Sequence, residues 1–305
     1  MKKDFICIWD LDKSKILNLF QSANYLKKLT KEGKVYHPLE GKTLAMIFEK
    51  SSTRTRVSFE VGMYQLGGRS LFLSSQDIQL GRGESIEDTA RVLSRYVDGI
   101  MIRTTEHQRV ERLAKASTVP VINGLTDLLH PCQALSDYYT LWEKEKELDK
   151  IKLAYIGDGN NVCHSLILGA AKLNISIWVA TPKEYQPQKK IIKIIKKAKE
   201  GEEKIHLLRD PKQAVEQADV VYTDVWTSMG WEKETEIRKK IFQPYQLNLA
   251  LLSKAKPDAL VMHCLPAHRG EEITNEVIDG KNSIVFEQAE NRLHLQKAIL
   301  LDLLG

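Results

Sequence analysis

The densest group of chemically active side chains lies in EKSSTRTRVSFEVG, where hydroxyl and guanidinium groups directly follow an apolar run. Ser52, Thr53 and Thr55 supply hydroxyl donors, and Arg54 supplies a planar fork that suits a phosphate group. The helix expected to begin here adds backbone amides, which favour anions. Because four such donors in consecutive positions exceed the needs of helix capping, the segment predicts a phosphate site.

Three more segments place polar or reactive groups directly after apolar runs. LLHPCQALSD carries His130 and Gln133 around a proline suited to the start of a helix, VMHCLPAHRG carries Cys264, and DVWTSMG carries Asp224. Each has a structural interpretation when taken alone: a helix cap for His130 and Asp224, and a small buried hydrophobe for Cys264. A carboxylate that follows a strand also suits a cationic ligand.

The segment YIGDGNNVCHS partly matches a dinucleotide-binding fingerprint, since Gly157 and Gly159 follow an apolar run. The third glycine is replaced by Val162, and the expected acidic residue is missing from its usual distance. Nucleotide binding is therefore disfavoured. The amides of Asn160 and Asn161 instead suit the carboxylate of an amino acid.

The elements that must position these groups follow from the apolar pattern. Short apolar runs alternate with helix-like segments over 43–49, 70–73, 99–103 and 120–124, and the alternation restarts after 150 with runs at 151–157, 175–180, 204–210, 220–226 and 259–265. Such alternation is typical of doubly wound parallel sheets, in which ligands lie at the carboxyl ends of the strands. The charged segment 137–150 is interpreted as the bridge between two α/β domains.

Composition sets wider limits. A chain of 305 residues with 43% apolar content is long enough for two compact domains, and 45 basic against 40 acidic residues give only a mild preference for small anions. Four widely spaced cysteines suggest neither a disulfide framework nor a zinc ribbon. With no apolar stretch of 18 residues, we expect a cytoplasmic protein that binds neither membrane nor nucleic acid.

Four motifs occur together and in order: SSTRTR (51–56), HPCQ (130–133), DVWTSMG (224–230) and HCLP (263–266). Over essentially the whole chain they resemble the ornithine carbamoyltransferases, within the aspartate/ornithine carbamoyltransferase superfamily. The first two motifs are shared with the aspartate enzymes and imply carbamoyl phosphate as the donor. The other two imply ornithine as the acceptor.

The resemblance implies two doubly wound parallel-sheet domains with the active site in the cleft between them. A carbamoyl-phosphate-binding domain would span 1–136 and be completed by the C-terminal helix 288–305, and an ornithine-binding domain would span 137–287. The implied reaction moves the carbamoyl group to the side-chain amine of L-ornithine, giving L-citrulline and phosphate, and it needs no cofactor or metal.

The family's site residues carry over to matching positions. For carbamoyl phosphate they are Ser52, Thr53, Arg54, Thr55, Gln79, Arg103, His130, Gln133, Cys264, Leu265 and Arg292; those for ornithine are Asn161, Asp224, Ser228 and Met229. Arg54, Arg103, His130 and Cys264 form the implied catalytic set. In this family Gln79 reaches the site of a neighbouring subunit, so the resemblance implies a homotrimer or a multiple of trimers.

The chemistry agrees with this assignment, because attack of an amine on the carbonyl carbon creates an oxyanion and expels phosphate. Donors held in advance around both groups lower the barrier. The amine of ornithine has a pKa of roughly 10.5 by analogy with lysine, so it must first lose a proton. Our hypothesis is that Cys264 orients the amine and relays this proton without forming a covalent bond.

Other classes of function explain less of the chain. A hydrolase using Cys264 with His130 or His263 leaves STRTR unexplained, and a metal site from these residues and Cys132 matches no standard ligand spacing. The lysine-rich segment 186–204 is interpreted as a core-facing helix with a solvated basic face, rather than as a surface for membrane or nucleic acid. The nearest alternative is a carbamoyltransferase for another amine, such as putrescine or an N-acylated ornithine.

Overall fold

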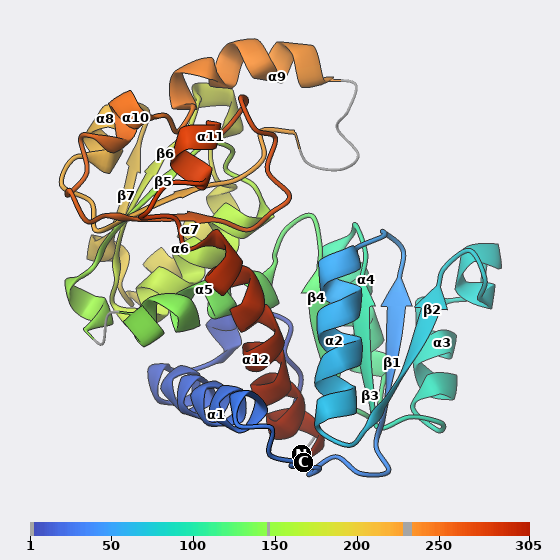
Figure 1. Ribbon diagram of the computed structural model, residues 1–305. Helices are drawn as coiled ribbons and strands as arrows, with labels where there is room; N and C mark the ends of the chain where they lie inside the picture. The colour runs from blue at the N-terminus through green and yellow to red at the C-terminus, as the bar shows by residue number, and fades with distance from the viewer. Residues whose placement is uncertain (1–2, 145–146, 228–233) are drawn as a thin grey trace. The chain divides into compact units, whose positions relative to one another are not determined.

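The computed structural model describes residues 3–144, 147–227 and 234–305, and the chain divides into two compact units. Unit 1 comprises Met1–Tyr139 and Glu290–Gly305, and unit 2 comprises Thr140–Ala289. The end of the chain thus belongs to the unit that its first half builds (Figure 1). Each unit contains one wholly parallel sheet, which confirms the predicted pair of α/β domains.

Unit 1 is built on four strands in the order β2-β1-β3-β4. They are β1 (Thr43–Phe48), β2 (Arg69–Ser74), β3 (Gly99–Arg103) and β4 (Val121–Leu125). The two central strands, β1 and β3, are almost wholly buried, because helices cover both faces of a parallel sheet. Their continuous apolar sequences follow from this burial.

Helices α3 (Ile86–Leu93) and α4 (His107–Ala116) cover one face of this sheet through a cluster that includes Ile47, Ile100 and Val110. Helix α2 (Thr53–Gln65) is drawn in front of the sheet in Figure 1. Gly62 on this helix has no side chain, so another helix can pack close to it. A β-carbon at Gly62 would lie 3.4 Å from Lys297 Cγ and 3.6 Å from Leu300 Cδ1.

Lys297 and Leu300 belong to the C-terminal helix α12 (Val285–Leu304), which packs against α1 (Lys13–Lys31) as well as α2. Lys27 Nζ donates to Asn291 Oδ1 at 2.8 Å, and Lys297 Nζ donates to Thr30 Oγ1 at 2.6 Å. Lys27 Nζ also lies 4.0 Å from Glu290 Oε1, so these buried cations fix how the two helices meet within unit 1.

Unit 2 is built on five strands in the order β7-β6-β5-β8-β9. They are β5 (Lys152–Ile156), β6 (Ser176–Ala180), β7 (Ile205–Leu208), β8 (Val220–Thr223) and β9 (Leu260–His263). The apolar core on one face includes Ile156, Val221 and Val261, together with side chains of α8 and α11. All nine predicted strands are therefore present.

The helices of this half of the chain vary in length. They are α5 (Pro131–Lys144), α6 (Asn161–Leu173), α7 (Lys189–Ala198), α8 (Pro211–Val215), α9 (Thr235–Phe242), α10 (Leu249–Leu252) and α11 (Asn275–Ile278). Short 3-10 helices occur in both halves of the described chain: η1 (Ile8–Asp10), η2 (Gln79–Arg82), η3 (Leu148–Lys150), η4 (Lys183–Tyr185), η5 (Glu202–Lys204) and η7 (Gln243–Tyr245). Helix α5 runs from one unit into the other and begins at Pro131, as predicted.

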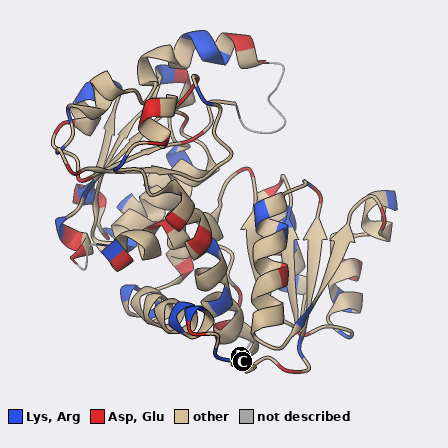
Figure 2. Ribbon diagram, viewed as in Figure 1, with Lys and Arg blue, Asp and Glu red and all other residues tan. Residues whose placement is uncertain are grey.

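The lysine-rich segment forms α7, whose Ile191 and Ile195 are buried while its lysines are exposed, so the predicted core-facing helix is confirmed. Basic and acidic residues are interspersed along the helices of both units (Figure 2). Among the described residues, no helix combines the length and apolar character that crossing a membrane requires.

The strand orders identify where each sheet can bind a ligand. The chain leaves β1 in one direction to form β2 and returns on the other side to form β3, and the same reversal occurs between β5 and β8. Loops diverge at such a switch point, and the carboxyl ends of its strands border a crevice. The chain segments after β1, β3, β5 and β8 are therefore the first places to examine for a site.

Candidate active site

The loop after β1 carries the predicted phosphate donors to the start of α2. Ser52 caps this helix, and its Oγ accepts from the backbone amide of Thr55 at 3.2 Å. Thr53 and Arg54 are exposed in the first turn, where the helix offers no acceptor for the backbone amides, whereas Thr55 is buried. Part of the hydroxyl set thus serves the cap, and the first turn keeps a donor-rich, cationic surface.

Arg103 is the last residue of β3 and pairs in register with Phe48 at the end of β1. Its carbonyl accepts the amide of Glu49 at 2.9 Å, which joins the two loops at the switch point of unit 1. The carboxylate of Glu49 also accepts from Arg109 Nη2 at 2.7 Å. Arg103 is therefore held, mostly buried, beside the chain that leads into the phosphate-type donors.

His130 lies directly before α5 and is buried. Burial lowers its pKa well below the ordinary value, and the positive charges of Arg292 and Arg103 lower it further. The imidazole is consequently neutral at physiological pH, and it can donate from one ring nitrogen while accepting at the other.

Arg292 joins two other predicted residues, Thr55 and Gln133, from distant parts of the sequence into one buried network. Its Nη1 donates to Gln133 Oε1 at 2.5 Å, and its Nη2 donates to Thr55 Oγ1 at 3.2 Å. Gln133 Nε2 in turn donates to Asp137 Oδ1 at 2.8 Å. Asp137 was not predicted, although its position one helical turn after Gln133 was a usable signal.

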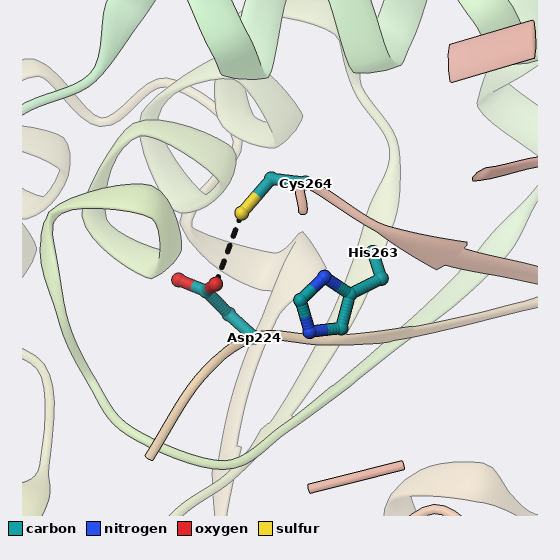
Figure 3. A group of neighbouring side chains, drawn as sticks. All are labelled: Asp224, His263 and Cys264. Atoms are coloured by element: carbon teal, nitrogen blue, oxygen red, sulfur yellow. Dashed lines mark hydrogen bonds between the residues drawn. The ribbon is translucent and has the colours of Figure 1, made fainter. Parts of the chain in front are cut away.

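In unit 2 the strand register brings Asp224 and Cys264 together. Thr223 pairs with His263, so the residues that follow them leave neighbouring strands side by side. The Cys264 thiol donates to Asp224 Oδ1 at 2.9 Å, and Figure 3 shows the sulfur directed at this carboxylate. In this arrangement the sulfur is a hydrogen-bond donor to the carboxylate, which disfavours the alternative of a nucleophilic cysteine.

The Asp224 carboxylate is held by two further donors. The amide of Val225 donates to Oδ1 at 2.8 Å, and Asn160 Nδ2 donates to Oδ2 at 2.7 Å. Asn160 also caps α6, since its Oδ1 accepts from the amides of Val162 and Cys163. Asn160 therefore orients Asp224 instead of offering a free amide, while Asn161, the first residue of α6, stays half-buried at the same strand ends.

His263 and Glu272 support the loop that carries Cys264. His263 Nδ1 accepts the amide of Leu265 at 2.8 Å, so Nε2 carries the proton and donates to Glu272 Oε1 at 3.0 Å. Both side chains are fully buried. This contact fixes Leu265, whose backbone takes the left-handed conformation with φ at 56°.

A second buried pair supports the loops after β5 and β8. Arg238 Nη1 on α9 donates to Asp158 Oδ2 at 2.9 Å and to the carbonyl of Trp226 at 2.7 Å. Its guanidinium lies 4.4 Å from the ring centroid of Tyr185. Burial raises the pKa of Asp158 to about 6, although Arg238 opposes this shift. No feature of the sequence indicated that Arg238 pairs with Asp158.

Asp224, His263 and Cys264 also offer ligand atoms within 4.8 Å of one another, a chemistry that suits a borderline metal ion. Both ring nitrogens of His263 are already engaged, however, and the Cys264 sulfur donates to Asp224. The set is therefore arranged as a hydrogen-bonded group.

Gln79, Ser228 and Met229 complete the set of predicted site residues. Gln79 begins η2 after the edge strand β2, and its side chain is exposed. Ser228 and Met229 lie outside the described residues.

Comparisons with known proteins match each half of the chain to a domain of one family. The family described as aspartate/ornithine carbamoyltransferase, carbamoyl-P binding domain, matches residues 3–143, and its Asp/Orn binding domain matches residues 149–303. An ornithine carbamoyltransferase of Syntrophus aciditrophicus is 58% identical over 98% of this chain and 99% of its own. The anabolic ornithine carbamoyltransferase of Pyrococcus furiosus is 56% identical over 99% and 96%.

A solved structure of the ornithine carbamoyltransferase from Pyrococcus furiosus superposes with a TM-score of 0.95 at 56% identity. The alignment covers 99% of this chain and 97% of that one. The likeness therefore extends over both units.

The depressed pKa of His130 makes stability depend on pH. Below the ordinary histidine value the unfolded chain takes up a proton that the folded chain refuses, so stability is lost as the pH falls. We expect His130→Gln to flatten this loss between pH 7.5 and 5, measured as urea-unfolding midpoints. The exposed His37→Gln is the control, and an equal slope in wild type and His130→Gln would contradict the prediction.

Replacing Arg238 leaves the buried Asp158 without its cation. We expect Arg238→Leu to lower the free energy of unfolding by about 3–5 kcal/mol, and Asp158→Asn in the same chain to restore part of it. Arg269→Leu breaks an exposed pair with Asp279 and is expected to lose at most about 1 kcal/mol. Similar losses for the two arginines in urea unfolding would show that burial of the pair does not matter.

Proposed function

The chain belongs to the aspartate/ornithine carbamoyltransferase family, and from this premise we propose that it transfers the carbamoyl group of carbamoyl phosphate to the side-chain amine of L-ornithine. The products are L-citrulline and phosphate. The name of the anabolic relative from Pyrococcus furiosus supports a role in arginine biosynthesis.

Unit 1 binds the carbamoyl donor in this proposal. The phosphate lies against Ser52, Thr53, Arg54 and Thr55 at the start of α2, with Arg103 as a second cation. Two guanidinium groups and several neutral donors match a dianion in charge and geometry. The observation that carries this half is the buried network in which Arg292 holds both Thr55 and Gln133.

The carbonyl group of carbamoyl phosphate needs a neutral hydrogen-bond donor, because a cation would be attracted more strongly to the phosphate. Neutral His130 suits this task, with Arg103 and Thr55 beside it, while Gln133 receives the carbamoyl amide. Cys264 and Leu265 contribute through a side chain or backbone group. As the amine attacks, negative charge grows on the carbonyl oxygen, and donors already in place stabilise it without reorganising.

Unit 2 binds the acceptor. Asp224 has the properties of an anchor for the α-ammonium of ornithine. Three donors fix its orientation, and none of these three donors carries a positive charge that would neutralise the carboxylate. Asn161 takes the α-carboxylate, and Ser228 and Met229 assist at the ammonium. Putrescine has neither α-group, so these residues favour ornithine over that amine.

The assembly and location belong to the same proposal. Gln79 extends from the edge of the sheet in unit 1 and is exposed, which suits a role in the site of a neighbouring subunit. The exposed Leu71 and Phe72 on β2 give this edge an apolar character that favours a homotrimer or a multiple of trimers. We assign the enzyme to the cytoplasm, with no nucleic-acid or membrane partner.

A parallel assay of acceptors tests the function. Purified protein is given carbamoyl phosphate with ornithine, putrescine, N-acetylornithine or aspartate, and the ureido product is measured. Citrulline is the expected major product, and Asp224→Asn is expected to raise KM for ornithine about tenfold or more by removing the charge that pairs with its ammonium. Negligible citrulline beside another product would overturn the assignment of ornithine.

The role of Cys264 is tested by its variants. If the thiol orients the attacking amine and relays its proton, Cys264→Ala should lower kcat by about 10²-fold, while KM for carbamoyl phosphate changes little. Cys264→Ser keeps a donor for Asp224 and should retain more activity with an altered pH profile, measured from pH 6 to 10. A serine variant with wild-type turnover across this range would remove Cys264 from proton transfer.

A further inference from the structure

The amide of Gln133 is engaged at both ends within unit 1. Its oxygen accepts from Arg292 Nη1 at 2.5 Å, and its nitrogen donates to Asp137 Oδ1 at 2.8 Å. The three side chains are 2%, 4% and 1% exposed for Gln133, Arg292 and Asp137. Water therefore does not replace either contact.

Only one orientation of this amide satisfies both neighbours. A guanidinium can only donate and a carboxylate can only accept, so a turned amide would set its NH2 against Arg292 and its oxygen against Asp137. Losing two buried hydrogen bonds of this kind disfavours the turned form by about 10²-fold or more. The second lone pair of Gln133 Oε1 is thus presented as a fixed acceptor.

The helix builds Asp137 into this position. Gln133 lies in the first turn of α5 and Asp137 follows four residues later, so both side chains leave the helix on the same face. Arg292 comes from α12, 159 residues away in the sequence, and reaches the amide from the other side. The carboxylate and the guanidinium therefore act on the same group from independent elements.

We propose that Asp137 is a specificity-determining residue, which fixes Gln133 as an acceptor and so makes the site select a carbamoyl group over an acetyl group. This inference rests on the proposed function, in which Gln133 meets the carbamoyl amide. Acetyl phosphate has the same size and the same phosphate, but a methyl group replaces the NH2. A fixed acceptor binds the NH2 and stays buried and unpaired against the methyl.

Asp137 acts through Gln133 and does not itself touch the substrate, so its effect must appear in discrimination between donors. In wild type the inhibition constant of acetyl phosphate should exceed KM for carbamoyl phosphate by about 10²-fold or more. Asp137→Leu has a similar shape but leaves the Gln133 nitrogen without its acceptor, and the amide loses its fixed position. We expect the preference for carbamoyl phosphate to fall by about tenfold or more.

A reciprocal exchange separates this role from a general need for negative charge. In Gln133→Glu/Asp137→Asn the charge moves by one helical turn, the asparagine donates to the glutamate, and an acceptor again faces Arg292 and the donor substrate. The double variant should recover most of the preference. Asp137→Asn alone keeps an acceptor oxygen that is no longer fixed, so it should lie between wild type and Asp137→Leu.

Inorganic phosphate is the control ligand, because it shares the phosphate donors and lacks the carbamoyl group. Its dissociation constant should change less than threefold in all variants, and melting temperatures report folding. Equal weakening of phosphate, acetyl phosphate and carbamoyl phosphate, or an unchanged preference in the Asp137 variants, would overturn the proposal. If Asp137→Leu does not fold, Asp137→Asn and the double variant decide. Failure of wild type to form citrulline would instead refute the proposed function.

Discussion

Every strand in the two sheets runs parallel to its neighbours, and this constraint decides where chemistry can be placed. Parallel strands need a crossover between them, so all carboxyl ends lie on one edge of a sheet and all loops that leave this edge lie together. Where the strand order reverses, two such loops diverge. Ser52 and Arg103 lie beside this point in unit 1, and Asn161 and Asp224 lie beside it in unit 2.

Buried polar groups then orient the side chains that the sheets collect. Such groups contribute little net stability, because removing them from water offsets what their contacts gain. Their effect is geometric: Arg292 fixes Gln133 and Thr55, Asn160 fixes Asp224, and Glu272 fixes His263 with its loop. A site that must hold donors ready for a reacting group needs this second set of contacts as much as the first.

The sequence predicts the local part of this arrangement well. Buried parallel strands are continuous apolar runs, which is why all nine were visible, and the helix starts at Thr53 and Pro131 follow from local capping and proline rules. Contacts between distant segments were not visible in the same way. Arg238 meets Asp158 across 80 residues, and nothing in the intervening spacing marks the pair.

Asn160 is a second case in which the sequence does not reveal a contact between distant segments. Its position after a strand suggested a polar contact with a ligand, but its partner Asp224 follows another strand 64 residues later. The choice between binding a ligand and orienting Asp224 depends on the register of β5 and β8, which sets Ile156 beside Thr223. Register is a property of the whole sheet, so reasoning from single residues could not find the contact between Asn160 and Asp224.

In unit 1, charged and neutral side chains are placed for different parts of the proposed donor, carbamoyl phosphate. Burial lowers the pKa of His130 and keeps it neutral, and the charges of Arg292 and Arg103 add to this shift; Arg103 also suits a phosphate dianion. A neutral imidazole does not compete for the phosphate and remains able to hydrogen-bond a carbonyl oxygen. Gln133, also neutral, is oriented by one of these cations and by Asp137. Arg103, which would bind the phosphate end of the donor, thus helps to keep His130 neutral for the other end, while Arg292 and Asp137 orient Gln133.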